Sequence, residues 1–209
     1  NRVSTPIIIL ILIAVGYLLG SINSALVVSK LLMGYDIRTK GSGNAGLTNS
    51  LRVMGAKPTL FVLVGDIAKG VVACLIGSHL MGALGVLIAG SAAIAGHMFP
   101  LYFGFKGGKG ILVGATMIAV FDWRVFCVAI AAFIVLVAIT KWVSLGSIVG
   151  SCLVPVMTLY FHWGEDMLLP MMIILVAMVT AVVYMHRSNI VRIAHGEENK
   201  FSLHSKKEH

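Results

Sequence analysis

The residues best suited to chemistry lie in three short polar segments, which long apolar stretches separate. They read GSGNAGLTNSLR (41–52), GHMFPLYFGFKGGKG (96–110) and HRSNIVR (186–192). Each combines glycine or small polar residues with Arg, Lys or His. Glycine lets backbone amides approach an anion, and a basic side chain balances its charge. The shared pattern indicates binding of phosphate groups.

The first segment offers backbone amides and one guanidinium. Its glycines formally match the GxGxxG pattern of dinucleotide-binding domains, but an apolar run rather than a strand precedes them, which argues against that fold. Arg52 presents a planar fork of donors that suits phosphate oxygens. A glycine-rich turn with helix caps is the structural alternative. The other residues expected to bind are Gly41, Ser42, Gly43, Asn44, Gly46, Thr48 and Asn49.

The second segment ends in the turn GGKG (107–110), directly before an apolar stretch. It fails the P-loop pattern, so no nucleotide chemistry is implied. We expect Lys109, flanked by glycines, to contact phosphate, whereas Lys106 is better explained as an interfacial lysine. The remaining binding residues expected here are His97, Gly107, Gly108 and Gly110.

The third segment follows the last apolar stretch. His186 and Asn189 lie three residues apart and would share a face if the helix continued past the stretch. A histidine in such a place can also be merely interfacial. Arg192 and Glu198 complete the set of residues expected to bind.

Composition shows what must position these segments. Hydrophobic residues make up 58% of the 209 residues and charged residues only 11%, against about 25% charged in a soluble domain. The chain therefore needs a lipid solvent. Its net charge of +8 fits basic residues held at the cytoplasmic side of a membrane. The basic residues rarely cluster with aromatic ones, which argues against a nucleic-acid partner.

We expect an all-α, polytopic bundle of about seven transmembrane helices in a single domain, 1–209. The basic connections alternate with connections that hold few basic residues and that carry Asp122, Glu165 and Asp166. The positive-inside bias then places the N-terminus outside and the C-terminus in the cytoplasm. Ser144 or Ser147 is expected to cap the sixth helix. The expected spans are roughly 6–29, 59–80, 82–99, 110–121, 124–140, 147–162 and 167–185.

Two charges interrupt the second apolar stretch. Asp66 and Lys69 lie three residues apart, so they share a helix face. They are either an ion pair that ties this helix to the bundle or part of the wall of a polar cavity. The three cysteines lie within apolar runs and have no metal-site spacing. We expect neither a metal nor a cofactor.

Together the motifs GSGNAGLTNSLRVMG (41–55), GHMFPLYFGFKGGKG (96–110) and HRSNIVRIAHGEENK (186–200) resemble the bacterial acyl-phosphate–glycerol-3-phosphate acyltransferases, called PlsY. The resemblance covers the whole chain in order and spacing. It implies an enzyme of the bacterial inner membrane, with its active site at the cytoplasmic face. Such an enzyme transfers a fatty acyl group from acyl phosphate to sn-glycerol 3-phosphate, giving lysophosphatidic acid and phosphate in the first acylation of phospholipid synthesis.

The resemblance also implies roles for single residues. Ser42, Arg52, Lys109 and Asn189 would contact the phosphates and the polyol. His186 would orient or deprotonate the attacking hydroxyl, although a phosphate oxygen of the donor could take that proton instead. Glu198 would pair with a basic residue. The partners would be the two substrates and membrane lipid. The oligomeric state is left open, with a monomer plausible.

Two other classes of protein compete with this interpretation. A transporter of phosphorylated metabolites would also carry basic, glycine-rich motifs, but transporters tend to have internal repeats and binding elements near the membrane midplane. No repeat is visible in this sequence. A scaffold subunit would not need three anion-binding motifs.

Overall fold

The computed structural model describes residues 4–201, so expectations for the tail beyond residue 201 lie outside it. Within those residues every regular element is a helix, as expected. The chain divides into two compact units, Asn1–Phe121 and Asp122–His209. The expected single domain stays a prediction.

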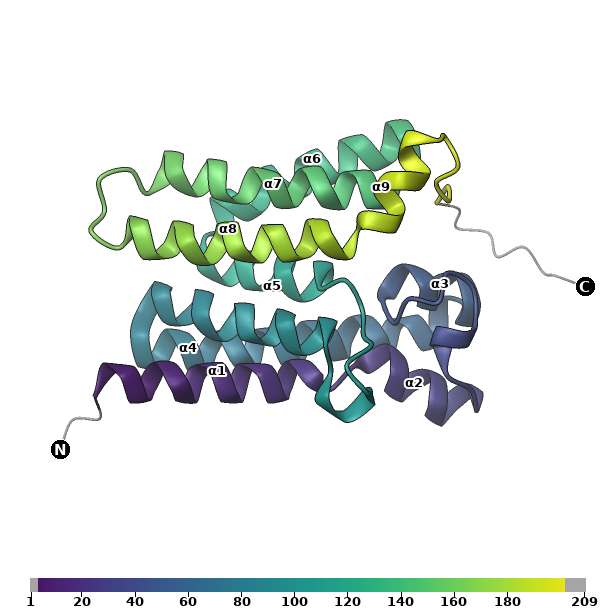
Figure 1. Cartoon of the computed structure of the whole chain (residues 1–209), viewed down its shortest axis with the longest axis horizontal. Helices are drawn as coiled ribbons and strands as arrows, with labels where there is room; N and C mark the ends of the chain where they lie inside the picture. Colours follow the sequence, from purple (N-terminus) through teal and green to yellow (C-terminus); the bar gives the residue numbers. More distant parts are fainter. Residues whose placement is uncertain (1–3, 202–209) are drawn as a thin grey trace, which may run out of the picture. The chain divides into compact units, whose positions relative to one another are not determined.

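The described residues of the first unit form seven helical elements, which Figure 1 draws in purple to teal. The first apolar run forms two helices instead of the one expected over 6–29, because it breaks at Ile22 and Asn23. The Asn23 Oδ1 accepts a hydrogen bond from the Leu26 amide at 3.0 Å and so starts the second helix. The elements are α1 (Thr5–Ser21), α2 (Ser24–Met33), η1 (Ile37–Thr39), α3 (Leu47–Met54), α4 (Ala56–Met98), η2 (Leu101–Phe103) and α5 (Ile111–Phe121).

Helix α4 folds back on itself. Met81 and Gly82 leave the helical region, and Gly82 has a φ of 59°, which favours glycine. The two limbs then run side by side, since a Cβ on Gly77 would overlap the Gly85 carbonyl. This fold lies at the boundary expected between the spans 59–80 and 82–99.

Small residues allow the helices of this unit to approach closely. A Cβ on Gly20 of α1 would overlap the Ala93 carbonyl of α4. Gly90 of α4 packs against Met117 of α5. Backbone contact between helices is the usual use of glycine in membrane bundles.

The second unit contains α6 (Trp123–Thr140), α7 (Val143–Phe161), α8 (Leu168–Met185) and α9 (Arg187–Ala194). Only Lys141 and Trp142 connect α6 to α7, so these two helices are antiparallel neighbours. Helix α7 begins earlier than the expected residue 147. Capping by Ser144 or Ser147 is therefore wrong: both lie inside the helix, and the Ser147 hydroxyl donates to the Val143 carbonyl at 2.9 Å.

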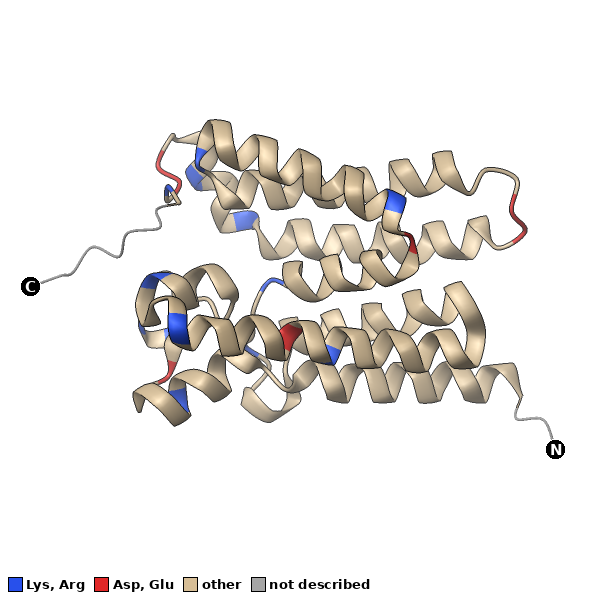
Figure 2. Cartoon of the chain, turned by 180° about the vertical axis from the view of Figure 1, so that it is seen from behind, with Lys and Arg blue, Asp and Glu red and all other residues tan. Residues whose placement is uncertain are grey.

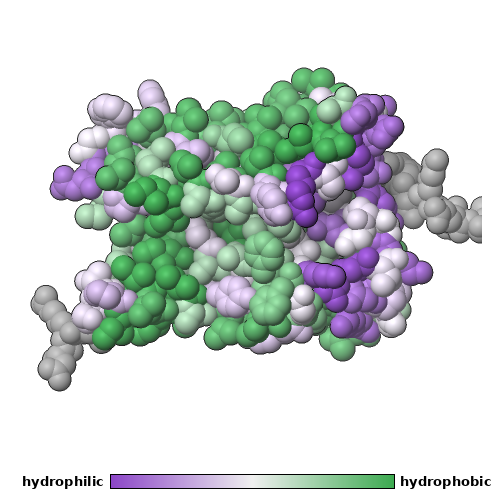
Figure 3. Space-filling model, in the orientation of Figure 1, coloured by the Kyte–Doolittle hydropathy of each residue, from purple (hydrophilic) through white to green (hydrophobic). Residues whose placement is uncertain are grey.

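Five helices in the described part of the chain are long and apolar enough to cross a membrane. Seven spans would follow if the two limbs of α4 and the shorter α5 each counted, so this number stays a prediction. The face drawn in Figure 3 is largely hydrophobic, and its most hydrophilic residues gather towards the right of the view. Figure 2 likewise shows few charges along the helices. This distribution suits a lipid solvent.

Candidate phosphate-binding site

Asn49 organises the first motif. This side chain is 1% exposed. Its Oδ1 accepts a hydrogen bond from the Ser42 amide at 2.9 Å, and its Nδ2 donates to the Lys40 and Asn44 carbonyls at 3.1 and 3.0 Å. All the polar atoms of the amide are therefore used to hold the turn 40–44. Asn49 therefore positions this turn, and its expected binding of substrate stays a prediction.

The turn presents its other residues outward. Ser42 and Thr48 are exposed, and so is Arg52 in the last turn of α3. Thr48 and Arg52 lie four residues apart, so they share a face of α3. No side chain caps the start of this helix at Gly46, and the first amides of a helix lack partners within it. Backbone donors, a hydroxyl and a guanidinium are thus available to an anion.

The second motif is tied to the end of α4. The Gly107 amide donates to the Met98 carbonyl at 3.0 Å, and the Gly108 amide donates to the His97 carbonyl at 3.1 Å. These two amides are therefore used within the protein and are not available to an anion. Lys109 is half-buried beyond them, next to Gly110, which has a φ of 77° at the start of α5.

The first and second motifs lie against each other. A Cβ on Gly108 would lie 2.7 Å from the Ala45 carbonyl, so only glycine permits this approach. The same carbonyl accepts a hydrogen bond from the buried Asn23 Nδ2 at 3.2 Å. The structure therefore brings together two sequence segments that were predicted separately to bind phosphate.

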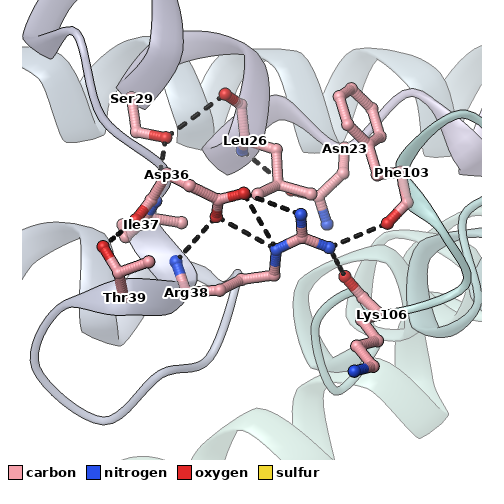
Figure 4. A network of polar contacts seen from close by, with 9 residues as sticks. All are labelled: Asn23, Leu26, Ser29, Asp36, Ile37, Arg38, Thr39, Phe103 and Lys106. Atoms are coloured by element: carbon pink, nitrogen blue, oxygen red, sulfur yellow. Dashed lines mark hydrogen bonds and ion pairs between the residues drawn. The ribbon is translucent and has the colours of Figure 1, made fainter.

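Sequence reasoning missed Arg38, which joins the same two segments (Figure 4). Its guanidinium pairs with the Asp36 carboxylate at 2.7 Å, and its Nη1 donates to the Phe103 and Lys106 carbonyls at 2.8 and 2.9 Å. The Arg38 guanidinium also holds the pKa of the Asp36 carboxyl below its usual value. No signal in the sequence distinguished Arg38 from the other basic residues near the helix ends.

Asp66 and Lys69 form the expected ion pair, with Lys69 Nζ 2.8 Å from Asp66 Oδ1. The ammonium also contacts His97 Nδ1 at 3.0 Å and donates to the Gly20 and Ile22 carbonyls at 3.1 and 2.9 Å. Both charged side chains are almost fully buried. The pair thus ties the two limbs of α4 to the end of α1, which favours the structural interpretation over a cavity wall.

His97 was expected to bind substrate, but it is 4% exposed and takes part in this buried cluster. Its Nδ1 lies 3.0 Å from Lys69 Nζ. The Nε2 edge faces Gly108, where a Cβ would overlap it. His97 therefore supports the second motif from behind.

In the second unit, α8 ends at Met185 and α9 begins at Arg187, so the helix does not continue smoothly through His186. His186 and Asn189 are both buried, at 2% and 5% exposure, and the His186 Nδ1 lies 2.8 Å from the Val182 carbonyl. The Asn189 Nδ2 donates to Glu198 Oε1 at 2.9 Å.

Glu198 connects Asn189 with Arg192. Its second carboxylate oxygen accepts from Arg192 Nε at 3.0 Å, which confirms the expected pairing with a basic residue. The following chain is held as well, since the Phe201 amide donates to the Lys141 carbonyl at 2.7 Å. Asn189 and Arg192 are therefore fixed by one buried carboxylate.

The residues between 4 and 201 contain no group of three or more His, Cys, Asp or Glu side chains arranged to hold a metal ion. The candidate site in the first unit consists instead of glycine turns, amide groups and basic side chains. Such a set can hold anions and stabilise negative charge that develops on oxygen.

Comparison with known proteins gives one consistent result. Residues 10–196 match the family described as glycerol-3-phosphate acyltransferase. A relative of that name from Thermoanaerobacter sp. (strain X514) is 40% identical over 186 residues, which cover 89% of this chain and 92% of the relative. Another, from Shouchella clausii (strain KSM-K16), is 42% identical over 197 residues and covers 88% and 92%.

Solved structures agree with the sequence relatives. The glycerol 3-phosphate form of PlsY, an integral membrane glycerol 3-phosphate acyltransferase, superposes with a TM-score of 0.84 at 31% identity, covering 93% of this chain and 96% of that one. Its lysophosphatidic acid form gives a TM-score of 0.81 at 29% identity, with the same coverage. The match extends over both units of the chain.

Proposed function

Because this chain belongs to the glycerol-3-phosphate acyltransferase family, we propose that it transfers a fatty acyl group from an acyl phosphate to the primary hydroxyl of sn-glycerol 3-phosphate. The products are lysophosphatidic acid and inorganic phosphate. The observation that carries this proposal is the contact between two phosphate-seeking motifs in the first unit, where Gly108 lies against Ala45. An acyl phosphate and glycerol 3-phosphate each bring one phosphate to such a place.

The chemistry needs no cofactor and no covalent enzyme intermediate. The hydroxyl oxygen attacks the carbonyl carbon of the mixed anhydride, and the bond from this carbon to the phosphate oxygen breaks. Phosphate leaves with the electron pair. The hydroxyl proton passes to His186 or to an oxygen of the donor phosphate. The protein's task is to hold two anions at reacting distance and to stabilise the developing charge.

We take the residue roles from the family resemblance and from the chemistry of the side chains in each motif. Arg52 and Lys109 bind phosphate oxygens, and the exposed Ser42 donates a hydrogen bond to substrate. Asn189 contacts the phosphates or the polyol, and His186 orients the hydroxyl. Asn49 and His97 position the turns behind these groups. The acyl chain lies in lipid or along apolar helix surface, and the phosphates are bound at the cytoplasmic face of a bacterial inner membrane.

The decisive assay uses the purified protein in detergent with acyl phosphate and glycerol 3-phosphate. Lysophosphatidic acid and phosphate should form in equal amounts. Parallel reactions with acyl-CoA and acyl carrier protein identify the donor: a faster reaction with either would overturn the acyl-phosphate assignment and leave the acyltransferase class intact. Uptake of glycerol 3-phosphate into vesicles without acylation would instead indicate a transporter.

Ser42 separates direct transfer from a covalent mechanism. Ser42→Ala should weaken catalysis by the loss of one hydrogen bond, about 1.5–3 kcal/mol with a charged partner, which is roughly tenfold to a hundredfold in rate. Mass spectrometry after treatment with donor alone should find Ser42 unmodified. An acylated Ser42 that then reacts with glycerol 3-phosphate would contradict direct transfer.

A further inference from the structure

The half-buried Arg38 side chain bonds both to a neighbouring carboxylate and to a distant loop. Nε and Nη2 hold both oxygens of Asp36, with distances between 2.7 and 3.2 Å. The remaining Nη1 donates to the main-chain carbonyls of Phe103 and Lys106, which lie 65 and 68 residues further along the chain. Figure 4 shows the guanidinium between the η1 turn and the loop that contains these carbonyls.

The two segments that Arg38 joins are the ones that carry the phosphate motifs of the first unit. On one side, Arg38 precedes Lys40, whose carbonyl accepts from Asn49 and from the Gly43 amide. On the other side, Lys106 precedes the turn whose Gly107 and Gly108 amides are tied to the end of α4. The Arg38 side chain is therefore a direct polar link between both turns.

A second Asp-x-Arg sequence shows that the same local ion pair can form without a link to a distant segment. Asp122 and Arg124 repeat the local geometry, with the Arg124 amide on Oδ1 at 2.8 Å and Nη2 on Oδ2 at 2.7 Å. In the Asp36 pair the corresponding distances are 2.9 and 2.7 Å. Within the described residues Arg124 donates only to Asp122, and its guanidinium lies over the Phe161 ring, 4.7 Å from its centre. The distant carbonyl bonds are thus what is particular to Arg38.

We propose that Arg38 is a positioning residue that sets the loop carrying Lys109 in register with the turn carrying Ser42. This inference rests on the proposed function, since it assigns phosphate binding to both turns. The guanidinium is required because its planar fork can bond a carboxylate on one edge and two carbonyls on the other. A lysine ammonium is a point charge and cannot bridge the same groups.

The test compares Arg38→Lys and Arg38→Ala with Arg124→Lys as the matched control. In Arg38→Lys we expect kcat to fall on the order of tenfold to a hundredfold, because misplaced reactants lose rate steeply. KM for glycerol 3-phosphate should change much less, since each turn still binds its phosphate. Arg124→Lys should keep wild-type kcat. Added guanidinium ion, well below denaturing concentration, should restore part of the activity of Arg38→Ala.

Amide hydrogen exchange gives a readout that does not depend on activity. In Arg38→Lys the Phe105, Gly107 and Gly108 amides should exchange faster than in the wild type, while the α5 amides keep their protection. If the wild type shows no acylation, the proposed function fails, and exchange still tests the link. If the wild type acylates but Arg38→Lys keeps its kcat and its exchange pattern, the inference alone is overturned. Equal losses in Arg124→Lys, or general loss of protection without rescue, would also overturn it.

Discussion

Lys109 and Lys106 allow a comparison between two lysines of one loop. Lys109 sits between glycines at the start of α5, whereas Lys106 is exposed and contributes only its carbonyl to Arg38. Lys109→Ala should lower kcat/KM by about 1.5–3 kcal/mol, or roughly tenfold to a hundredfold, through loss of a charge-assisted hydrogen bond to phosphate. Lys106→Ala should stay near wild type. Steady-state rates with both variants inserted at normal levels make the comparison, and similar rates in the two would remove Lys109 from the site.

Asn49 should act through the fold of its turn rather than through substrate. Asn49→Asp keeps the Oδ1 acceptor for Ser42 but removes the donor to the Lys40 and Asn44 carbonyls. Each lost bond to a buried group costs about 1–3 kcal/mol. We therefore expect a lower thermal unfolding midpoint in detergent together with lower activity. Lost activity at an unchanged midpoint would show that Asn49 binds substrate directly.

At the scale of single residues, the sequence revealed the basic residues beside the glycine turns. It did not reveal the residues that hold these turns in place. Arg52 and Lys109 stand out because glycine and basic side chains form a recognisable local pattern. Arg38 and Asn23 do not, because each acts through carbonyls more than 20 residues away, and any residue type can supply a carbonyl. His97 was found for its type, but its buried contact with Lys69 could not be read from the sequence.

The Asp66–Lys69 pair belongs to the packing of α4 against α1. Removing only the ammonium, as in Lys69→Met, leaves the buried Asp66 carboxylate without its 2.8 Å partner and should cost about 3–5 kcal/mol. The double variant Asp66→Asn with Lys69→Met should unfold at a higher temperature than Lys69→Met. Thermal unfolding in detergent measures both. If the double variant were less stable than Lys69→Met, the unpaired Asp66 carboxylate would not be the cause of the instability of Lys69→Met.

The ends of α6 and α7 carry a second polar cluster, in which the Asp122 carboxylate caps α6 and contacts Arg124 and His162. Hydrogen bonding to Arg124 lowers the Asp122 pKa from 3.8 to about 2. A lowered pKa in the folded state contributes stability above pH 3.8, and this contribution is lost as the pH falls towards 2. The wild-type unfolding midpoint should drop more than that of Asp122→Asn between pH 5 and pH 2.5. Parallel curves for the two proteins would refute this role.

Helices were the most predictable feature of the fold, because a run of apolar residues is a local property. The structure keeps a helix in each expected stretch, and the fold of α4 falls at Met81 and Gly82, where a boundary was expected. The break before α2 was missed, since Asn23 interrupts the run only through its own cap and its bond to Ala45. The early start of α7 was missed because Ser144 resembles a cap in sequence.

Acidic and basic residues lie at opposite ends of the second unit. The acidic residues Asp122, Glu165 and Asp166 lie where α6 begins and after α7 ends, and antiparallel packing of these helices puts the two places at one end. Lys141 and Lys200 lie at the other end, where the Phe201 amide reaches the Lys141 carbonyl at 2.7 Å. The positive-inside bias then predicts that the basic end faces the cytoplasm.

Cysteine labelling in intact cells tests this orientation. In a variant with Cys74, Cys127 and Cys152 replaced by alanine, Asp166→Cys and Lys200→Cys place one thiol at each end of the unit. The 19 residues of α7 extend over roughly 28 Å at about 1.5 Å per residue, close to the roughly 30 Å of a bilayer core, so the two ends should lie on opposite sides. A membrane-impermeant maleimide should label Asp166→Cys directly and Lys200→Cys only after permeabilisation. The reverse pattern would place His186 and Asn189 outside the cell, where the proposed reaction could not use cytoplasmic substrates.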